Sequence, residues 1–139
     1  MNIVPMILAA GKGTRMKSSL PKVLHKAAGL PMLSHVLNAC EGLTANSRPV
    51  VVVGHGASLV QETYGDGLIY ALQQQQLGTG HAVMTGFAQI PQDADGVLVA
   101  CGDTPLLRPD TLQQMAALFQ QTKAACVLLT AYAKQPQGY

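Results

Sequence analysis

Three short segments of this chain are apolar at every position, and they constrain its fold more than any other feature. They are Met6–Ala10, Pro49–Val53 and Val97–Cys101. A strand without polar alternation is buried on both faces, which is typical of parallel sheets in α/β proteins. Stretches with helical periodicity separate the three segments, as crossovers between parallel strands require. The sequence therefore predicts an α/β fold, a parallel sheet with helices on both faces.

The other elements are predicted from periodicity and from the positions of glycine and proline. The first strand is expected to begin at Met6 or to bulge at Pro5, because a central proline cannot donate to the ladder. In the helix predicted at 80–90, we expect Val83, Met84 and Phe87 to form the apolar face. In the helix predicted at 109–121, we expect Leu112, Met115, Ala116 and Phe119 to face one way. The predicted helices are Pro31 to Cys40, Ala57–Tyr64, Gly80–Ile90 and Pro109–Gln121, and the remaining predicted strands are Leu68–Leu72 and Ala124–Tyr132.

Composition excludes several classes of function. At 139 residues the chain has the length of one domain, and 48% hydrophobic residues are enough for a globular core. A net charge of +2 is too small to support binding to nucleic acid or to a membrane, and no apolar segment approaches the length of a membrane span. Cys40, Cys101 and Cys126 lie in apolar runs without metal-ligand spacing, so we expect buried free thiols in a cytoplasmic protein.

The segment after the first predicted strand has the residues of a phosphate-binding loop. Gly11 and Gly13 let backbone N–H groups approach a ligand, and the cationic side chains of Arg15 and Lys22 follow. The loop lacks the third glycine of the dinucleotide fingerprint and the Gly-Lys-Ser/Thr ending of the P-loop, so neither hydride transfer nor P-loop hydrolysis is supported. The alternative is an ordinary strand-to-helix turn with exposed basic residues. The arginine and the lysine favour phosphate binding.

Asp103 follows the predicted strand Val97–Cys101 through Gly102, at the carboxyl end where parallel sheets bind ligands. A carboxylate at this position is suited to hold Mg²⁺ on a substrate phosphate. The alternative is a helix cap or an Asx-turn, for which Thr104 and Pro105 are suitable neighbours. Because a phosphate loop is predicted on another strand of the same sheet, metal binding is the favoured interpretation.

A second polar loop precedes the helix predicted at 80–90. The amides of Gln73 and Gln76 can pair with the edge of a base, and the glycines around Thr79 let backbone groups approach a flat ligand. The alternative is a polar surface turn in which Thr79 caps the next helix. The histidines show no spacing of a metal site or catalytic triad. His81 lies beside the candidate site, and its role is left open.

Four motifs occur together along the chain: Leu8-Ala9-Ala10-Gly11-x-Gly13-Thr14-Arg15-Met16, Pro21-Lys22-Val23-Leu24, Gln73-x-x-Gln76-Leu77-Gly78-Thr79-Gly80-His81-Ala82 and Gly102-Asp103. The first, second and fourth resemble those of the sugar-phosphate nucleotidyltransferases. The third narrows the resemblance to the uridylyltransferase domain of the bacterial bifunctional N-acetylglucosamine-1-phosphate uridylyltransferase/glucosamine-1-phosphate acetyltransferases. The resemblance covers the whole chain, up to Gln137-Gly138-Tyr139.

The resemblance implies roles for individual residues. Arg15 and Lys22 would face the triphosphate as catalytic residues, Asp103 would hold Mg²⁺, and Gln73 would contact uracil. Cys101 stands where family members often have an aromatic residue, so that side-chain contact is expected to differ. The substrate-binding residues implied are Leu8, Ala9, Ala10, Gly11, Gly13, Thr14, Lys22, Gln73, Gly78, Thr79, Cys101, Gly102 and Asp103.

The resemblance also implies an activity, the transfer of a uridylyl group from UTP to N-acetylglucosamine 1-phosphate for bacterial cell-envelope precursors. It implies a Rossmann-like fold of the nucleotide-diphospho-sugar transferase type. The chain would be the nucleotide-binding part of a longer domain, without the acetyltransferase β-helix with which oligomers of the family are associated. Two alternatives stay open: a nucleotidyltransferase for another base, such as a molybdopterin guanylyltransferase, and a truncated, inactive nucleotide-binding module.

Overall fold

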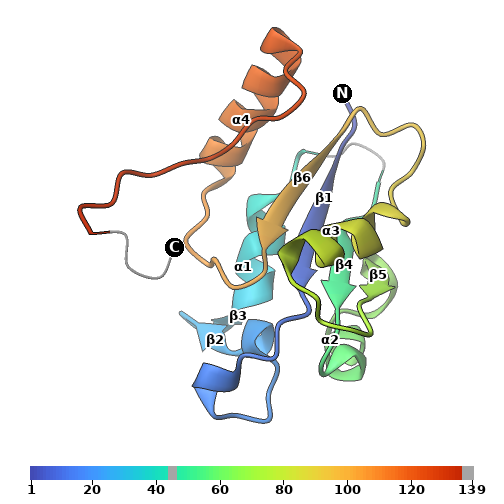
Figure 1. Cartoon of the computed structure of the whole chain (residues 1–139), viewed down its shortest axis with the longest axis vertical. Coiled ribbons are helices and arrows are strands. Elements are labelled where there is room, and N and C mark those ends of the chain that lie inside the picture. The colour runs from blue at the N-terminus through green and yellow to red at the C-terminus, as the bar shows by residue number, and fades with distance from the viewer. Residues whose placement is uncertain (44–46, 136–139) are drawn as a thin grey trace.

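A four-stranded parallel sheet forms the centre of the part of the chain that the computed structural model describes, residues 1–43 and 47–135 (Figure 1). Its strands are hydrogen-bonded in the order β5-β4-β1-β6 and every pairing is parallel, which confirms the predicted sheet. The motif residues Gln137-Gly138-Tyr139 lie outside the described residues. The strands are β1 (Ile3–Ala9), β4 (Val50–Val53), β5 (Ile69–Leu72) and β6 (Gly96–Cys101).

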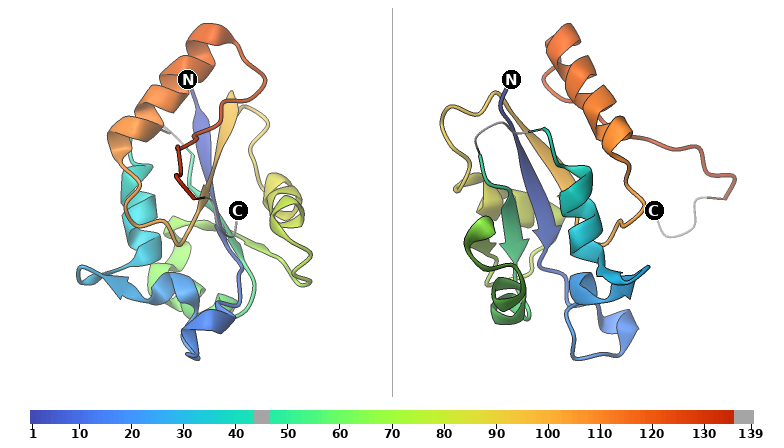
Figure 2. Two further views of the ribbon diagram at one scale, coloured as in Figure 1. Left: turned by 60° about the vertical axis from the view of Figure 1, so that its left-hand side comes forward. Right: turned by 180° about the vertical axis from the view of Figure 1, so that it is seen from behind.

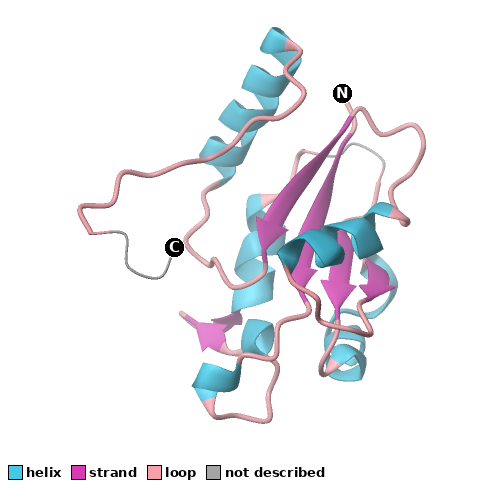
Figure 3. Cartoon of the chain, viewed as in Figure 1, coloured by secondary structure: helices cyan, strands magenta, loops and turns pink. Residues whose placement is uncertain are grey.

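Helices cover both faces of the sheet, as predicted (Figures 2 and 3). Helix α3 (Thr79–Phe87) lies on one face, and α1 (Met32–Ala39), α2 (Ala57–Tyr64) and α4 (Pro109–Thr122) lie on the other. None of the helices in the described ranges is both long and apolar enough to cross a membrane. The short elements are the 3-10 turns η1 (Thr14–Met16), η2 (Lys22–Leu24) and η3 (Gly65–Gly67), and the antiparallel pair β2 (Lys26–Ala27) and β3 (Leu30–Pro31).

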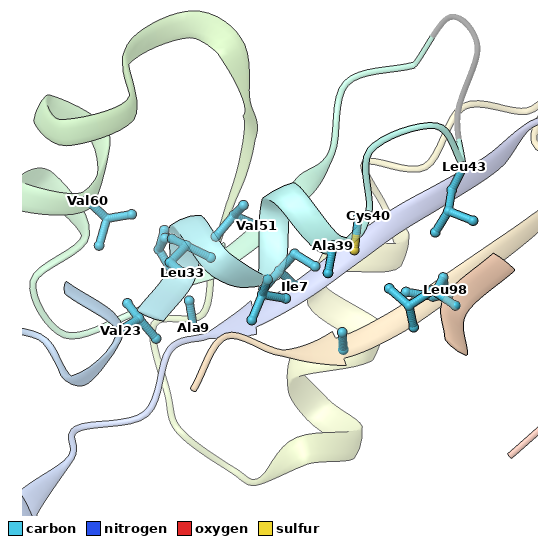
Figure 4. Close-up of a cluster of buried hydrophobic side chains, with 14 of the residues drawn as sticks. Ile7, Ala9, Val23, Leu33, Ala39, Cys40, Leu43, Val51, Val60 and Leu98 are labelled. Atoms are coloured by element: carbon cyan, nitrogen blue, oxygen red, sulfur yellow. The ribbon is translucent and has the colours of Figure 1, made fainter. Parts of the chain in front are cut away.

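Each face of the sheet carries its own apolar cluster, because successive side chains of a strand point to opposite faces. Ile7 and Val51 belong to the cluster that includes Leu33 of α1 (Figure 4). Met6 and Val52 belong to the cluster under α3. All five side chains are fully buried. Burial of a side chain of this size contributes about 1.5–3 kcal/mol, which explains why β1 and β4 are apolar at every position.

The contact of α3 with the sheet differs from the prediction. Met84 and Phe87, expected on the apolar face, are 74% and 60% exposed. Val83, the third residue of the predicted face, does pack against the cluster under α3, but the residues that the helix buries are Ala82 and Gly86. A Cβ at Gly86 would lie 2.7 Å from a Val52 methyl and 2.8 Å from the sulfur of Met6. Small residues therefore let α3 lie directly on the sheet. In α4 the predicted face is confirmed: Leu112 is buried, and Met115 and Ala116 pack against the α1 cluster.

Pro5 lies within β1, so the expectation that the strand begins at Met6 or bulges was wrong. Pro5 is paired with Leu98 of β6, but the pairing of β1 with β4 begins only at Met6. At Pro5 the strand therefore has a neighbour on one side only. Proline is tolerated where one side of a strand is unpaired.

The strand predicted at Ala124–Tyr132 was also wrong, since these residues form no strand in the structure (Figure 3). Leu128 and Leu129 are exposed. A β-strand needs a second strand to receive its backbone hydrogen bonds, and none of the described residues pairs with this segment. Apolar composition without a neighbouring sheet edge therefore does not produce a strand here.

The three cysteines are free, but only one of them is buried, contrary to the expectation for all three. Cys40 lies in the core at the end of α1, and burial raises the pKa of its thiol to about 11. Cys101 and Cys126 are exposed. The apolar residues around each cysteine therefore predicted burial correctly only for Cys40. Cys101 ends an edge strand, and Cys126 lies in the unpaired segment after α4.

Candidate functional site

The strand order places a binding crevice at a defined point of the sheet. From β1 the chain adds β4 and β5 on one side and then returns to add β6 on the other side. Ligands of parallel sheets bind at the carboxyl ends of the strands, at the point where the order reverses. A pocket of about 360 Å³ opens there, between the ends of β1 and β6. This volume lies in the range of small-molecule sites.

Most of the residues implied by the resemblance line this pocket. Gly13, Thr14, Arg15 and Gly102 do not, although they lie in the same loops. Val23 and Ala82 also line it, although the sequence assigned them no site role. Gln76, which the sequence suggested as a base-pairing amide, lines it as well. The predicted residues in the lining are Leu8, Ala9, Ala10, Gly11, Lys22, Gln73, Gly78, Thr79, Cys101 and Asp103.

An ion pair stands at one end of the pocket. The Nζ atom of Lys22 donates to Oδ2 of Asp103 at 2.5 Å, joining residues that are 81 positions apart in the chain. The side chains are 40% and 34% exposed, so both charges remain accessible to a ligand. Burial, followed by the charge of Asp103, raises the pKa of the nearby Cys101 thiol, and Lys22 opposes this shift. Cys101 therefore lines the pocket as a neutral thiol.

Gly102 carries Asp103 over the end of β1. Its N–H donates to the carbonyl oxygen of Leu8 at 2.9 Å. A Cβ at this position would lie 3.1 Å from a Val23 methyl and 3.2 Å from the Leu8 oxygen. The glycine therefore acts through backbone packing, which explains why it does not itself line the pocket.

The predicted phosphate loop packs against Lys22. Gly13 has a left-handed backbone, with φ of 58° and ψ of 35°. A Cβ there would lie 2.8 Å from Cβ of Lys22. Both the left-handed backbone and this close approach therefore require glycine. Arg15 follows in η1, where its side chain is exposed and outside the pocket lining. The loop thus packs on Lys22 through Gly13, while Arg15 stays outside the pocket lining.

The other end of the pocket is polar but uncharged. Gln73 follows β5 directly, and its backbone N–H donates to the Val53 oxygen at 2.8 Å. The residue is 4% exposed. The amide nitrogen of Gln73 lies 3.3 Å from the Gly78 oxygen and 2.9 Å from Nδ1 of His81. Helix α3 begins at Thr79 with Gly78 as its N-cap and no side-chain cap, so the expected alternative role of Thr79 as the cap is wrong.

Gln76 connects the loop after β5 to the end of β1. Its Nε2 donates to the carbonyl oxygen of Ala10 at 2.6 Å. A Cβ at Gly54 would lie 2.9 Å from that same oxygen and 3.0 Å from Nε2 of Gln76. The loop after β5 is therefore held against the ends of β1 and β4 by a side-chain amide.

The side chains at the pocket could hold a divalent cation only if a bound ligand supplied further oxygen atoms. No cluster of three or more histidine, cysteine, aspartate or glutamate side chains exists among residues 1–43 and 47–135. Asp103 supplies one carboxylate, whose Oδ1 atom makes no hydrogen bond to the described residues. Magnesium is commonly bound by one or two carboxylates together with substrate phosphates. Asp103 meets this requirement.

Comparison with known proteins identifies the family of this chain. The family model of the MobA-like NTP transferase domain matches residues 5–137. The bifunctional protein GlmU of Heliobacterium modesticaldum is 49% identical over 96% of this chain, and that of Exiguobacterium sibiricum is 50% identical over 100% of it. The chain spans 29% and 31% of the length of these two relatives.

Solved structures agree with the fold. A nucleotidyl transferase from Methanothermobacter thermautotroptrophicus superposes with a TM-score of 0.70 at 24% identity, covering 84% of this chain and 57% of its own. The Mycobacterium tuberculosis protein Rv0371c superposes with a TM-score of 0.72 at 22% identity, covering 85% of this chain and 60% of its own. Rv0371c has also been solved as a manganese complex. The apolar parallel sheet, the pocket at its switch point and the match over residues 5–137 lead to one conclusion: this chain belongs to the family of MobA-like NTP transferase domains.

Proposed function

We propose that this chain carries the nucleotide-binding site of an enzyme that transfers a uridylyl group from UTP to N-acetylglucosamine 1-phosphate, releasing pyrophosphate. The observation that carries the proposal is the pairing of Lys22 with Asp103 at the switch point of the sheet, opposite a buried amide at Gln73. One end offers charge to phosphates, and the other offers hydrogen bonds to a base. The identity of about 50% to proteins named GlmU supports uridylyl transfer over other nucleotidyl transfers.

The chemistry of the two ends of the pocket supports one orientation of the nucleotide. The uracil ring lies against Gln73, Gly78 and Thr79, where backbone and amide groups can reach its edge. The ribose lies along the end of β1, over Ala9 and Ala10. The triphosphate then reaches Lys22 and Asp103. The remaining residues proposed to bind substrate are Leu8, Gly11, Gly13, Thr14, Cys101 and Gly102.

Catalysis in this arrangement needs no protein nucleophile. An oxygen of the sugar phosphate attacks the α-phosphorus, the bond from that phosphorus to the β-phosphate bridging oxygen breaks, and pyrophosphate leaves. Lys22 and Arg15 neutralise the charge that grows on the α-phosphate and on the leaving group. Asp103, which now holds Lys22, would hold a divalent cation, for which we propose Mg²⁺, and the bound cation supplies further charge neutralisation on the phosphates. Positioning and charge therefore account for the rate.

The direct test is turnover. The chain is incubated with Mg²⁺, N-acetylglucosamine 1-phosphate and either UTP or GTP, and the nucleotide sugar is quantified. We expect UDP-N-acetylglucosamine from UTP and no product from GTP. Preference for GTP would instead assign the chain to guanylyl transfer. UTP binding without turnover would identify an inactive nucleotide-binding module.

A further inference from the structure

The hydrogen bonds around Gln73 fix the orientation of its amide. The carbonyl oxygen of Gly78 can only accept hydrogen bonds, and it lies 3.3 Å from the side-chain nitrogen of Gln73. If the amide were reversed, two oxygens would face each other, which is repulsive. The NH₂ group of Gln73 must therefore point toward Gly78. The same Gly78 oxygen also accepts the N–H of Ala82, at 3.1 Å, and so anchors the start of α3.

This orientation determines the tautomer of a neutral His81 ring. The nitrogen of Gln73 lies 2.9 Å from Nδ1 of His81 and has a second hydrogen to donate. Nδ1 must therefore be the acceptor, which places the ring proton of a neutral His81 on Nε2. Both hydrogens of the Gln73 amide are then used inside the protein.

The polar atom of Gln73 that remains is the carboxamide oxygen. Within the described part of the chain it makes no hydrogen bond, and it is not among the fully enclosed atoms that lack a partner there. Gln73 is almost completely buried except where it lines the pocket. The group presented to a ligand is therefore a hydrogen-bond acceptor and not a donor.

We propose that His81 is a positioning residue that sets base selectivity by locking the Gln73 amide with its oxygen toward the base. This inference rests on the proposed function, in which Gln73 faces the base. A hydrogen-bond acceptor at this place pairs with the ring N–H of uracil. It repels the unprotonated ring nitrogen that cytosine presents at the same position, because two acceptors then face each other. His81 would thus discriminate UTP from CTP, two nucleotides of almost identical shape, without touching either of them.

The first test needs no nucleotide. The ¹⁵N shifts of the His81 ring and the amide protons of Gln73 are measured in the 139-residue chain. We expect the proton of the neutral ring on Nε2, and a scalar or cross-relaxation connection between the Gln73 amide and Nδ1. A ring with its proton on Nδ1 would overturn the inference, whatever the chain binds.

The second test uses two variants of the same residue. His81→Phe keeps a ring but removes the acceptor, whereas His81→Asn keeps an acceptor oxygen near the place of Nδ1. Affinities for UTP and CTP are measured by calorimetry. We expect the preference for UTP to fall about tenfold in His81→Phe, the worth of one hydrogen bond, and to be largely kept in His81→Asn.

The outcomes separate this inference from the proposed function. If the wild-type chain prefers UTP and His81→Phe weakens UTP and CTP equally, the proposed function stands and the positioning role is refuted. Equal behaviour of His81→Phe and His81→Asn would refute it as well, since a purely structural role of the ring does not depend on an acceptor. A wild-type chain that does not distinguish UTP from CTP refutes base selection at this amide altogether.

Discussion

The two ends of the pocket are built in opposite ways. At the end of β6, Lys22 and Asp103 form an ion pair whose members are about one-third exposed or more. At the end of β5, the amide of Gln73 is almost wholly buried and is held by Gly78 and His81. Charge acts over distance and tolerates small displacements, whereas a hydrogen bond to a buried amide depends on direction. The first end is therefore suited to phosphates and rate, and the second to the identity of the base.

The largest expected effects are on turnover at the charged end. Arg15→Ala, Lys22→Ala and Asp103→Ala should each lower the rate of UDP-N-acetylglucosamine formation by about 10²–10³. Lys17→Ala is the matched control, because Lys17 is an exposed lysine directly after η1. Circular dichroism and thermal melts should show that the variants fold. Near-wild-type turnover in all three variants would remove the charged end from the proposed mechanism.

The next effect concerns how the charged end is positioned. Gly13→Ala should lower the free energy of unfolding by about 1–3 kcal/mol, because it combines a left-handed backbone with a Cβ 2.8 Å from Cβ of Lys22. Gly11→Ala is the control, since a Cβ there meets nothing within 4 Å. Both values are measured by urea unfolding. Equal stability of the two variants would mean that the loop does not pack on Lys22 as described.

Gln73→Ala should affect selectivity at the buried end while sparing the charged end. We expect the ratio of UTP to CTP affinity to fall about tenfold, and the affinity for pyrophosphate to stay within about twofold of wild type. Calorimetry with the three ligands measures both. If pyrophosphate binding fell in parallel with UTP binding, the two ends would not act separately and the comparison would break down.

The smallest effect is expected at Gln76, which holds the loop after β5 to the end of β1. Gln76→Ala removes the hydrogen bond to the Ala10 oxygen and should cost about 0.5–1.5 kcal/mol of stability. UTP and CTP affinities should both decrease by a few-fold, with their ratio unchanged, because Gln76 holds the loop and does not face the base. A change in the ratio alone would assign Gln76 to base recognition instead.

The sequence was sufficient for the parts of the fold that burial determines. Strands β1 and β4 are apolar throughout because both faces of the sheet are covered there, and that pattern was readable without coordinates. The edge strand β6 is apolar as well, although Val99 and Cys101 are exposed. The apolar face of α3 was predicted only in part: Val83 packs against the cluster under α3, but Met84 and Phe87 are exposed and the buried residues are Ala82 and Gly86. The segment after α4 has strand composition, but strand formation depends on a pairing partner that composition does not reveal.

The candidate site also has a part that the sequence predicts and a part that it does not. Glycines, cations and a carboxylate at strand ends predicted the charged end, since their chemistry is local to each motif. The pairing of Lys22 with Asp103 depends on the sheet order, which brings β6 beside β1. The role of His81 could not be predicted, because it depends on the first turn of α3 returning to the end of β5. A glutamine and a histidine eight positions apart carry no signal of that contact by themselves.

The most direct test of the whole account is UTP binding to this chain by calorimetry. It is measured with and without Mg²⁺, against CTP and GTP, and in Asp103→Ala. We predict binding that is selective for UTP, that weakens when Mg²⁺ is withheld, and that loses its dependence on Mg²⁺ in the variant. Binding of all three nucleotides with equal affinity, or none by a well-folded chain, would contradict the assignment of the two ends of the pocket to phosphate and to base.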